Sequence, residues 1–323
     1  MTELNYWLDD SDSSVATFWV KVKDDLSFKD TTVYIYYGQA DAQSASNGNN
    51  VFAFFDDFSG TSIDSSKWTV IGNGEWSIDN GAVRGTRGTQ PGHTSWDDII
   101  EGSYSPGVHE LLHAKIKLNT GDNNGFVYYR FKDADNIIMG YLQIPNLLYM
   151  SGRTSGYWEE APSNCDWSPN TWYNMEVTET TPNTFTATLN GACAVSNTLE
   201  PVTGNLGLFP GGLSEYITWW DNVYVRKYAS PEPNQGIWGS EEKLSEQQVT
   251  TTSVTSIRTV IETTAVTSTQ INIATITQST TLTSAVTARP AEQAAEPLTS
   301  AWAIGATIIA LALTEVLLLK RTR

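Results

Sequence analysis

The sequence predicts an all-β protein built around an antiparallel sandwich of two sheets. Short runs of alternating apolar and polar residues recur along the first 228 residues, and Gly and Asn turns separate them. The same region contains no stretch with the 3.6-residue period of an amphipathic helix. Many short strands at regular spacing are typical of a sandwich whose neighbouring strands run antiparallel.

The expected strands share alternating apolar residues, many of them β-branched or aromatic, between turn residues. In order, they are Val15 to Val22, Thr32 to Tyr37, Val51 to Phe58, Glu75 to Ile78, Ala82 to Thr86, His109 to Leu118, Gly125 to Phe131, Ile137 to Gln143, Thr171 to Glu179, Thr184 to Leu189, Gly204 to Leu208 and Ile217 to Tyr228. Five tryptophans in or beside these runs are expected in the core and rim of the sandwich, namely Trp68, Trp76, Trp172, Trp219 and Trp220.

Residues 1–50 form a short β-segment of their own. The runs WLDDSDSSVATFWVKVKDDL and TTVYIYYGQADAQSASNGNNVFAFFDDF resemble the second half of an uncharacterised β-domain of archaeal and bacterial envelope proteins. The resemblance implies a partial module of unknown function in an archaeal-type envelope. A segment of this length buries too little apolar surface to be stable by itself. It is therefore expected to pack on the sandwich or to be the remnant of a longer domain.

Residues 51–242 are expected to form the sandwich, and roughly Phe55 to Tyr228 carry a second resemblance. The runs FFDDFSGTSIDSSKWTVIGNGEWSIDNGAVRG, NTGDNNGFVYYRFKDADNIIMGYL, TWYNMEVTETTPNTFTATLNG, GNLGLFPGG and WWDNVYVRKY resemble the concanavalin A-like lectin/glucanase superfamily, which includes laminin-G-like modules. The resemblance implies a jelly-roll sandwich. This fold carries lectins, hydrolases and plain spacers, so it does not choose among these functions.

The paired carboxylates of a glucanase are absent from the sequence. Glucanases of this fold place carboxylates in a pattern like Glu-x-Asp-x-x-Glu, so that alternate side chains point together at the scissile bond. Asp97, Asp98 and Glu101 have the wrong spacing for one strand face, and the adjacent Glu159 and Glu160 point to opposite faces. A binding module is therefore the preferred reading, and a carbohydrate-active enzyme with an atypical site remains the alternative.

Candidate ligand-binding residues combine aromatic faces, which stack on sugar rings, with polar groups that pair with hydroxyls. Tyr128 and Arg130 share one face if their strand is regular, and the polar segment GRTSGYWEEAP is expected to be a loop that presents further candidates. The expected binding residues are Tyr128, Arg130, Arg153, Tyr157, Trp158 and Glu159.

A structural calcium ion is implied by the resemblance, because many domains of this superfamily hold one where the first and last strands meet. The matching positions are Asp57 and Asp221. Calcium takes six to eight oxygens, so backbone carbonyls from turns near Gly72 to Gly74 or Gly81 would have to contribute.

The two cysteines, Cys165 and Cys193, are too few for a metal cluster. Outside the cell they are expected to form a disulfide that contributes roughly 2 to 4 kcal/mol, with two free buried thiols as the alternative.

Residues 243–300 form a Thr/Ser-rich stalk. Its runs contain few charges and almost no large apolar residue besides Val and Ile, so they cannot build a core and are expected to be disordered. Such a density of Thr and Ser suits O-linked sugars, which would extend the chain. An unmodified flexible linker is the equal alternative.

Residues 301–319 are predominantly apolar, with Glu315 as their only strongly polar residue, and precede the basic tail 320–323. At 1.5 Å per residue they are about long enough to cross a bilayer as one helix. Basic flanks stay in the cytoplasm, so the predicted transmembrane helix leaves the preceding residues outside the cell. A core helix and a cleaved lipid-anchor signal are the alternatives.

The formal net charge of −17 excludes a nucleic-acid partner and docking of the ectodomain on anionic lipid. The sequence thus predicts a cell-surface protein with a single membrane span. Its sandwich is expected to bind glycan or surface-layer material, and a structural or protein-adhesion role is the second interpretation.

Overall fold

The structure is a computed structural model with two compact units, Met1–Ile237 with Pro297–Arg323 and Trp238–Glu296. It describes most of the chain up to residue 232 and short strands beyond it. The described residues are 3–11, 15–23, 31–35, 43–87, 96, 98–120, 124–143, 145–211, 216–229, 232, 254–255, 258–261, 275–278, 281–282 and 304–309. Within them it confirms the all-β class, because the only helix is the four-residue α1 (Gly48–Val51).

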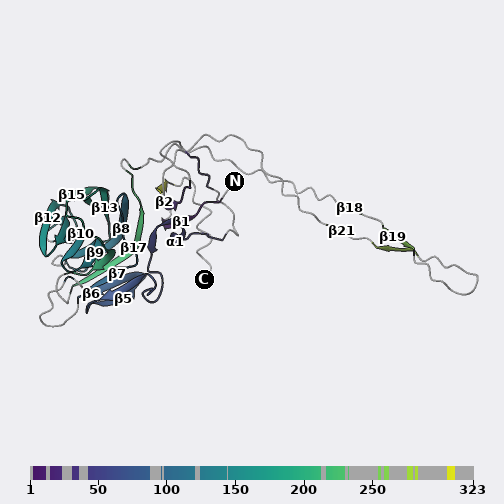
Figure 1. The fold of residues 1–323 in the computed structure, drawn as a ribbon. Helices are drawn as coiled ribbons and strands as arrows, with labels where there is room; N and C mark the ends of the chain where they lie inside the picture. The colour runs from purple at the N-terminus through teal and green to yellow at the C-terminus, as the bar shows by residue number, and fades with distance from the viewer. Residues whose placement is uncertain are drawn as a thin grey trace, which may run out of the picture. The chain divides into compact units, whose positions relative to one another are not determined.

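A seven-stranded sheet forms one layer of the sandwich (Figure 1). All its neighbouring strands pair antiparallel. Their order across the sheet is β12 (Tyr157–Asn164), β11 (Leu147–Thr154), β10 (Asn136–Gln143), β9 (Gly125–Asp133), β16 (Asn205–Phe209), β7 (Ile99–Gly102) and β4 (Trp68–Ile71).

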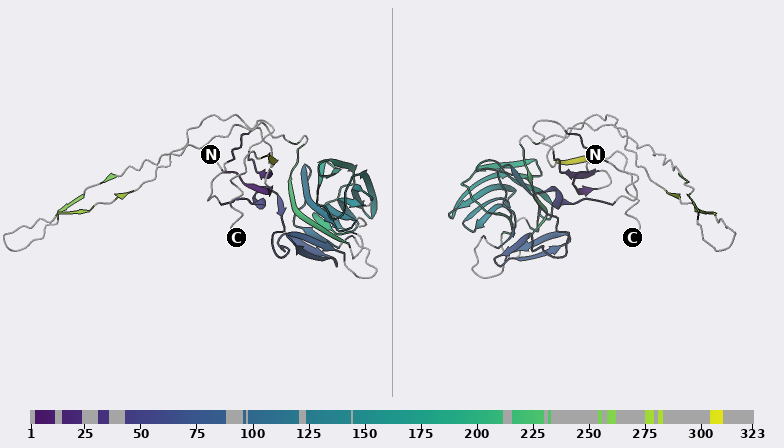
Figure 2. Two further views of the ribbon diagram at one scale, coloured as in Figure 1. Left: turned by 180° about the vertical axis from the view of Figure 1, so that it is seen from behind. Right: turned by 45° about the vertical axis from the view of Figure 1, so that its right-hand side comes forward.

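An eight-stranded sheet forms the other layer, and Figure 2 shows its longest strand, β17, in green. The short strand β3 (Phe54–Asp56) pairs with β17 beside the main order. That order is β15 (Cys193–Thr198), β14 (Thr184–Leu189), β13 (Tyr173–Thr181), β8 (Glu110–Leu118), β17 (Ile217–Lys227), β6 (Ala82–Thr86) and β5 (Glu75–Asp79).

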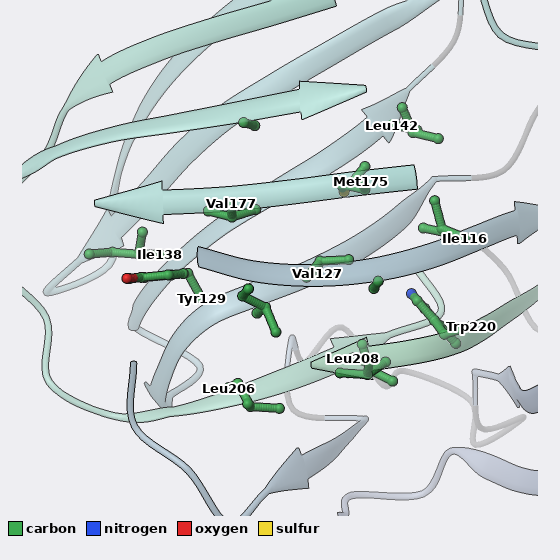
Figure 3. Close-up of a cluster of buried hydrophobic side chains, with 14 of the residues drawn as sticks. Ile116, Val127, Tyr129, Ile138, Leu142, Met175, Val177, Leu206, Leu208 and Trp220 are labelled. Carbon is green, nitrogen blue, oxygen red and sulfur yellow. The ribbon is translucent and has the colours of Figure 1, made fainter. Parts of the chain in front are cut away.

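The hydrophobic core lies between the two sheets (Figure 3). Strand β8 shows how the sequence specifies it, because alternate residues point to opposite faces of a strand. Leu112, Ala114 and Ile116 face the core, and Lys115 and Lys117 face outward. Trp220 from β17 is fully buried in the same core. Burial of each large apolar side chain contributes about 1.5–3 kcal/mol.

The N-terminal segment packs on the outer face of the eight-stranded sheet. Its strands β1 (Tyr6–Ser11) and β2 (Val15–Val20) form a hairpin. Trp7 and Trp19 contact Phe52 and Tyr224, with ring centroids 5.4–6.0 Å apart. These aromatic contacts bury Tyr224 of β17 almost completely. Of the two arrangements expected for this segment, the structure shows packing on the sandwich.

The C-terminal residues differ from the predicted helix. Ile304–Ile309 form strand β22, which pairs antiparallel with β2, so that the backbone groups on that side bond to a neighbouring strand instead of within a helix turn. The other residues of the predicted span 301–319 lie outside the described residues. The part of the chain that the structure describes contains no helix long and apolar enough to span a membrane.

Within the predicted stalk, the described residues are strands rather than structureless chain. Two short antiparallel pairs join β18 (Val254–Thr255) to β21 (Thr281–Leu282), and β19 (Arg258–Ile261) to β20 (Thr275–Gln278). The β-branched Thr, Val and Ile of these stretches favour an extended backbone, which explains the difference.

Candidate functional site

The outer face of the seven-stranded sheet carries a continuous cluster of aromatic side chains, here called the aromatic face. Strand register aligns Tyr149, Tyr141 and Phe126 in one row across β11, β10 and β9. Tyr141 stacks on Tyr149 at 4.6 Å and on Phe126 at 4.7 Å between ring centroids. The buried members of the cluster are Ile99, Phe126, Tyr128, Phe131, Ile137, Met139, Tyr141 and Phe209.

Trp96 covers the middle of the aromatic face. Its ring lies 5.5 Å from those of Phe126 and Phe209, and its carbonyl accepts a hydrogen bond of 3.3 Å from the hydroxyl of Tyr128. Tyr128 is consequently 0% exposed. Tyr128, predicted as a ligand contact, is therefore buried beneath the aromatic face and is not accessible to a ligand in this structure.

The accessible end of the aromatic face is the hairpin of β11 and β12. Register places Arg153 opposite Trp158, and Ser151 opposite Glu160. The sequence interpretation of GRTSGYWEEAP as a loop is wrong. Ser155 and Gly156 have φ values of +50° and +84°, so they form a tight turn that joins two strands.

Trp158 is 37% exposed and firmly held. Its ring packs edge-on against Trp96 at 4.9 Å, and the guanidinium of Arg153 lies 5.3 Å from its centroid. Arg153 is itself anchored, because it donates a 2.8 Å hydrogen bond to the carbonyl of Ala134 and pairs with Asp135 at 3.0 Å. Because Trp96 and Arg153 contact the Trp158 ring from two sides, its exposed surface has a fixed orientation toward solvent.

Glu160 completes this end of the face and accepts a 2.9 Å hydrogen bond from the hydroxyl of Tyr141. Burial and the nearby Glu160 carboxylate raise the pKa of Tyr141 well above its usual range, so the hydroxyl stays protonated and donates. We call Tyr149, Arg153, Trp158 and Glu160 the hairpin site.

Glu160 was missed in the sequence, and the signal that could have found it is its spacing from Trp158. Residues two apart on a strand share a face. The candidate Glu159 instead pairs with Gly152 and points away from Trp158. Tyr157 is 81% exposed at the hairpin turn. It lies two residues before Glu159 and points to the same side of β12, so it too lies off the aromatic face.

Arg130 does not share a face with Tyr128, contrary to the expectation. The register of β9 and β10 shifts between Tyr128 and Arg130, which leaves Tyr129 as the extra residue of a bulge. Arg130 therefore turns toward the core side, where it donates to the carbonyl of Pro106 at 3.1 Å and pairs with Glu179. Its charge is neutralised inside the sandwich and does not reach the hairpin site.

Cys165 and Cys193 form a disulfide, the pairing that the sequence favours. The bond joins the chain just after β12 to the first residue of β15 in the other sheet. The hairpin that carries Trp158 is thereby tied to the edge of the eight-stranded sheet.

Asp57 and Asp221 lie close enough to influence one another, as the calcium prediction requires. Burial raises the pKa of Asp221 to about 6. A hydrogen bond from the Asn222 amide and the charge of Lys115 lower this pKa, and the negative charges of Asp57 and Asp9 raise it further. Lys115 pairs with Asp9 at 3.6 Å and places an ammonium in this group. The described residues include no cluster of three acidic, His or Cys side chains arranged for a metal ion, so these donors alone do not fit Ca²⁺.

The raised pKa of Asp221 gives a pH-dependent prediction. The folded value of about 6 exceeds the ordinary 3.8, so this carboxyl stabilises the fold below about pH 4 and loses that contribution as the pH rises through 6. We expect Asp221→Asn to raise the free energy of unfolding by about 1–2 kcal/mol at pH 7.5, after allowance for solvent screening.

Urea denaturation in the presence of chelator at pH 7.5 and pH 4 checks this expectation, since the gain should vanish at pH 4. Asp64→Asn is the control. Hydrogen bonds from Ser66 lower the pKa of Asp64, so its substitution should shift the pH dependence in the opposite direction. An Asp221→Asn gain of the same size at both pH values would contradict the account.

Comparisons with known proteins give partial matches. The model of a domain family of unknown function (DUF2341) matches residues 1–71, and no curated protein matches. A carbohydrate-binding module, CBM66, from Bacillus subtilis matches with a TM-score of 0.41 and 18% sequence identity, and the match covers 49% of this chain and 94% of that one. A β-glucanase from Bacillus licheniformis also matches with a TM-score of 0.41, at 12% sequence identity, and the match covers 53% of this chain and 96% of that one. A galectin from Caenorhabditis elegans matches with a TM-score of 0.33 and 12% sequence identity, and the match covers 50% of this chain and 98% of that one. The function has to follow from the geometry of this chain.

Proposed function

We propose that the protein binds a glycan at the hairpin site and does not cleave it. The observation that carries this proposal is Trp158, a half-exposed indole that Trp96 and Arg153 hold in place at the open end of the aromatic face. Sugar rings stack on such indole surfaces through their C–H faces. An aromatic side chain that is already ordered loses little entropy when a ligand binds.

The polar groups beside Trp158 suit sugar hydroxyls. Arg153 supplies guanidinium donors, and the exposed Glu160 supplies an acceptor that Tyr141 orients. A few oriented polar groups around an aromatic surface are typical of small-ligand sites. The accessible patch spans only two strands, so it matches the end of a glycan chain or one to two sugar units better than a long polymer.

The placement of carboxylates supports binding without hydrolysis. Glu101 on β7 and Glu160 on β12 are five strands apart, about 24 Å along the sheet at about 4.8 Å per strand. The two carboxylates of the β9–β10 turn are engaged, because Asp135 pairs with Arg153 at 3.0 Å and Asp133 accepts hydrogen bonds from Asn136 and from the amide of Asp135. Glycosidases hold their two carboxyl groups about 5 to 10 Å apart. Glu101 is also engaged, because it accepts a 3.1 Å hydrogen bond from Asn205.

A glycan array probed with the detergent-solubilised full chain tests this function. We expect selective binding to one family of glycans, unchanged in size after hours of contact with the protein. A folded chain that is silent on a broad array would contradict glycan binding and favour a structural or protein-adhesion role. Release of new reducing ends would contradict the non-catalytic assignment.

The proposal includes display at a cell surface, with residues 301–319 as a membrane anchor and 243–300 as a stalk. Its support is the apolar composition of 301–319 before the basic residues 320–323. Ile304–Ile309 pair with β2 in the structure, so anchoring requires this strand to leave β2 and enter the bilayer as a helix. Retention of the chain in membranes after alkaline extraction supports the anchor, and full release would contradict it.

A structural Ca²⁺ at Asp57 and Asp221 stays a proposal that needs oxygen ligands beyond the side chains seen there. Addition of Ca²⁺ is expected to raise the melting temperature relative to chelator. The same melting temperature in both conditions would count against it.

A further inference from the structure

The outer face of the eight-stranded sheet carries a second ordered group of side chains, far from the aromatic face. Strand register aligns Lys117 of β8 with Trp219 of β17, and Trp219 with Arg84 of β6. Because Tyr173 pairs with Ile116, Trp172 comes next to Lys117. The four residues Trp172, Lys117, Trp219 and Arg84, here called the tryptophan row, run from the start of β13 across β8 and β17 to β6.

Aromatic and cationic groups alternate along the tryptophan row. The ammonium of Lys117 lies 4.8 Å from the ring centroid of Trp172 and 4.5 Å from that of Trp219. The indole nitrogen of Trp219 donates a 2.9 Å hydrogen bond to Asp79, which fixes the ring. Two cation–π contacts therefore hold the Lys117 side chain in one place on the sheet.

The cations of the row are available to a ligand. In the described part of the chain, neither Lys117 nor Arg84 lies within ion-pair distance of a carboxylate, whereas Lys115 on the same face pairs with Asp9. Trp172 is 39% exposed, which places it at the rim of the sandwich and leaves much of its indole accessible. Strand β5 carries two carboxylates on this face, Glu75 and Asp79, and Asp79 is engaged by Trp219.

We propose that the tryptophan row binds an acidic glycan, with carboxylate or sulfate groups on Lys117 and Arg84 and the sugar rings against Trp172 and Trp219. Alternating indoles and cations match a chain that alternates C–H surfaces with anionic groups. The row extends about 14 Å across the sheet, the length of three strand spacings. This site lies on the opposite layer of the sandwich from the hairpin site and does not depend on it.

The net charge of −17 does not prevent such binding. At physiological ionic strength, charges more than about 8 Å away are largely screened, so the two local cations dominate the approach of a short ligand. A long polyanion such as nucleic acid meets many acidic groups of the chain at once. A short acidic oligosaccharide is accordingly the favoured occupant.

Isothermal titration of the detergent-solubilised full chain with tetragalacturonate tests the proposal, and its neutral counterpart tetragalactose serves as the second ligand. We expect tetragalacturonate to bind at least tenfold tighter than tetragalactose, with an affinity that falls as salt is added. Lys117→Gln should weaken it at least tenfold, Trp172→Ala at least fivefold, and Lys117→Arg less than threefold.

The matched control is Lys132→Gln, which removes an exposed cation of the other sheet that belongs to neither site and should leave this affinity unchanged. Circular dichroism and melting curves establish that each variant is folded. Equal affinity for tetragalactose and tetragalacturonate, or an unchanged affinity for tetragalacturonate in folded Lys117→Gln, would overturn the proposal. The cation–π contacts of the row would then only stabilise the sheet. Tighter binding of an acidic peptide or of single-stranded DNA would overturn the glycan assignment.

Discussion

Replacing Arg130 with Met is expected to destabilise the sandwich by about 3–5 kcal/mol, because it leaves a buried charge without its partner. Glu179 is only 2% exposed and pairs with Arg130. The carbonyl of Pro106 would also lose its donor from Arg130. Denaturant unfolding followed by tryptophan fluorescence measures the effect.

The control for this prediction is Lys132→Met on the same strand. Lys132 is exposed and has no ion pair among the described residues, so a change below about 0.5 kcal/mol is expected. The folded Arg130→Met protein should keep its affinity for the glycan of the hairpin site. A variant that is as stable as the wild type but has lost binding would restore Arg130 as a ligand contact and contradict the bulge argument.

Gly204→Ala is expected to have the second largest effect, a loss of about 2–3 kcal/mol from overpacking. A β-carbon at this position would lie 2.1 Å from the carbonyl oxygen of Phe131 and 2.4 Å from its carbon. Both are backbone atoms, so β9 and β16 would have to move apart directly beneath the aromatic face. Thermal and urea unfolding should both show the loss.

Gly60→Ala provides the comparison for Gly204→Ala. Its nearest neighbour would be the carbonyl of Ser62 at 3.4 Å, an ordinary contact at an exposed position. We expect little change in stability there. Equal effects at the two glycines would contradict the close approach of β9 and β16.

The fold was largely predictable because alternation is a local signal. Strands such as β14 and the second half of β8 alternate apolar and polar residues so regularly that their extended form and their buried face both follow from the sequence. Edge strand β12 gives no such signal, since YWEEAPSN has exposed residues on both faces. The sequence therefore favours a loop in place of the hairpin, although it identifies Trp158 and Arg153 as candidate binding residues.

The rest of the site depends on geometry that no local pattern encodes. One extra residue in β9, Tyr129, reverses the direction of Arg130. The role of Trp96 arises only when it contacts Phe126 and Phe209 from two other strands. The tryptophan row likewise results from the pairing of four strands that lie far apart in the sequence.

The central claim is that Trp158 anchors a glycan on the hairpin of β11 and β12. Isothermal titration of the full chain with the best array ligand tests it most directly, in parallel for wild type, Trp158→Ala and Tyr157→Ala. The account predicts at least a tenfold loss of affinity for Trp158→Ala, equivalent to about 1.4 kcal/mol, and no change for Tyr157→Ala, whose exposed ring lies on the same hairpin but off the aromatic face. Unaltered binding by folded Trp158→Ala would contradict the claim.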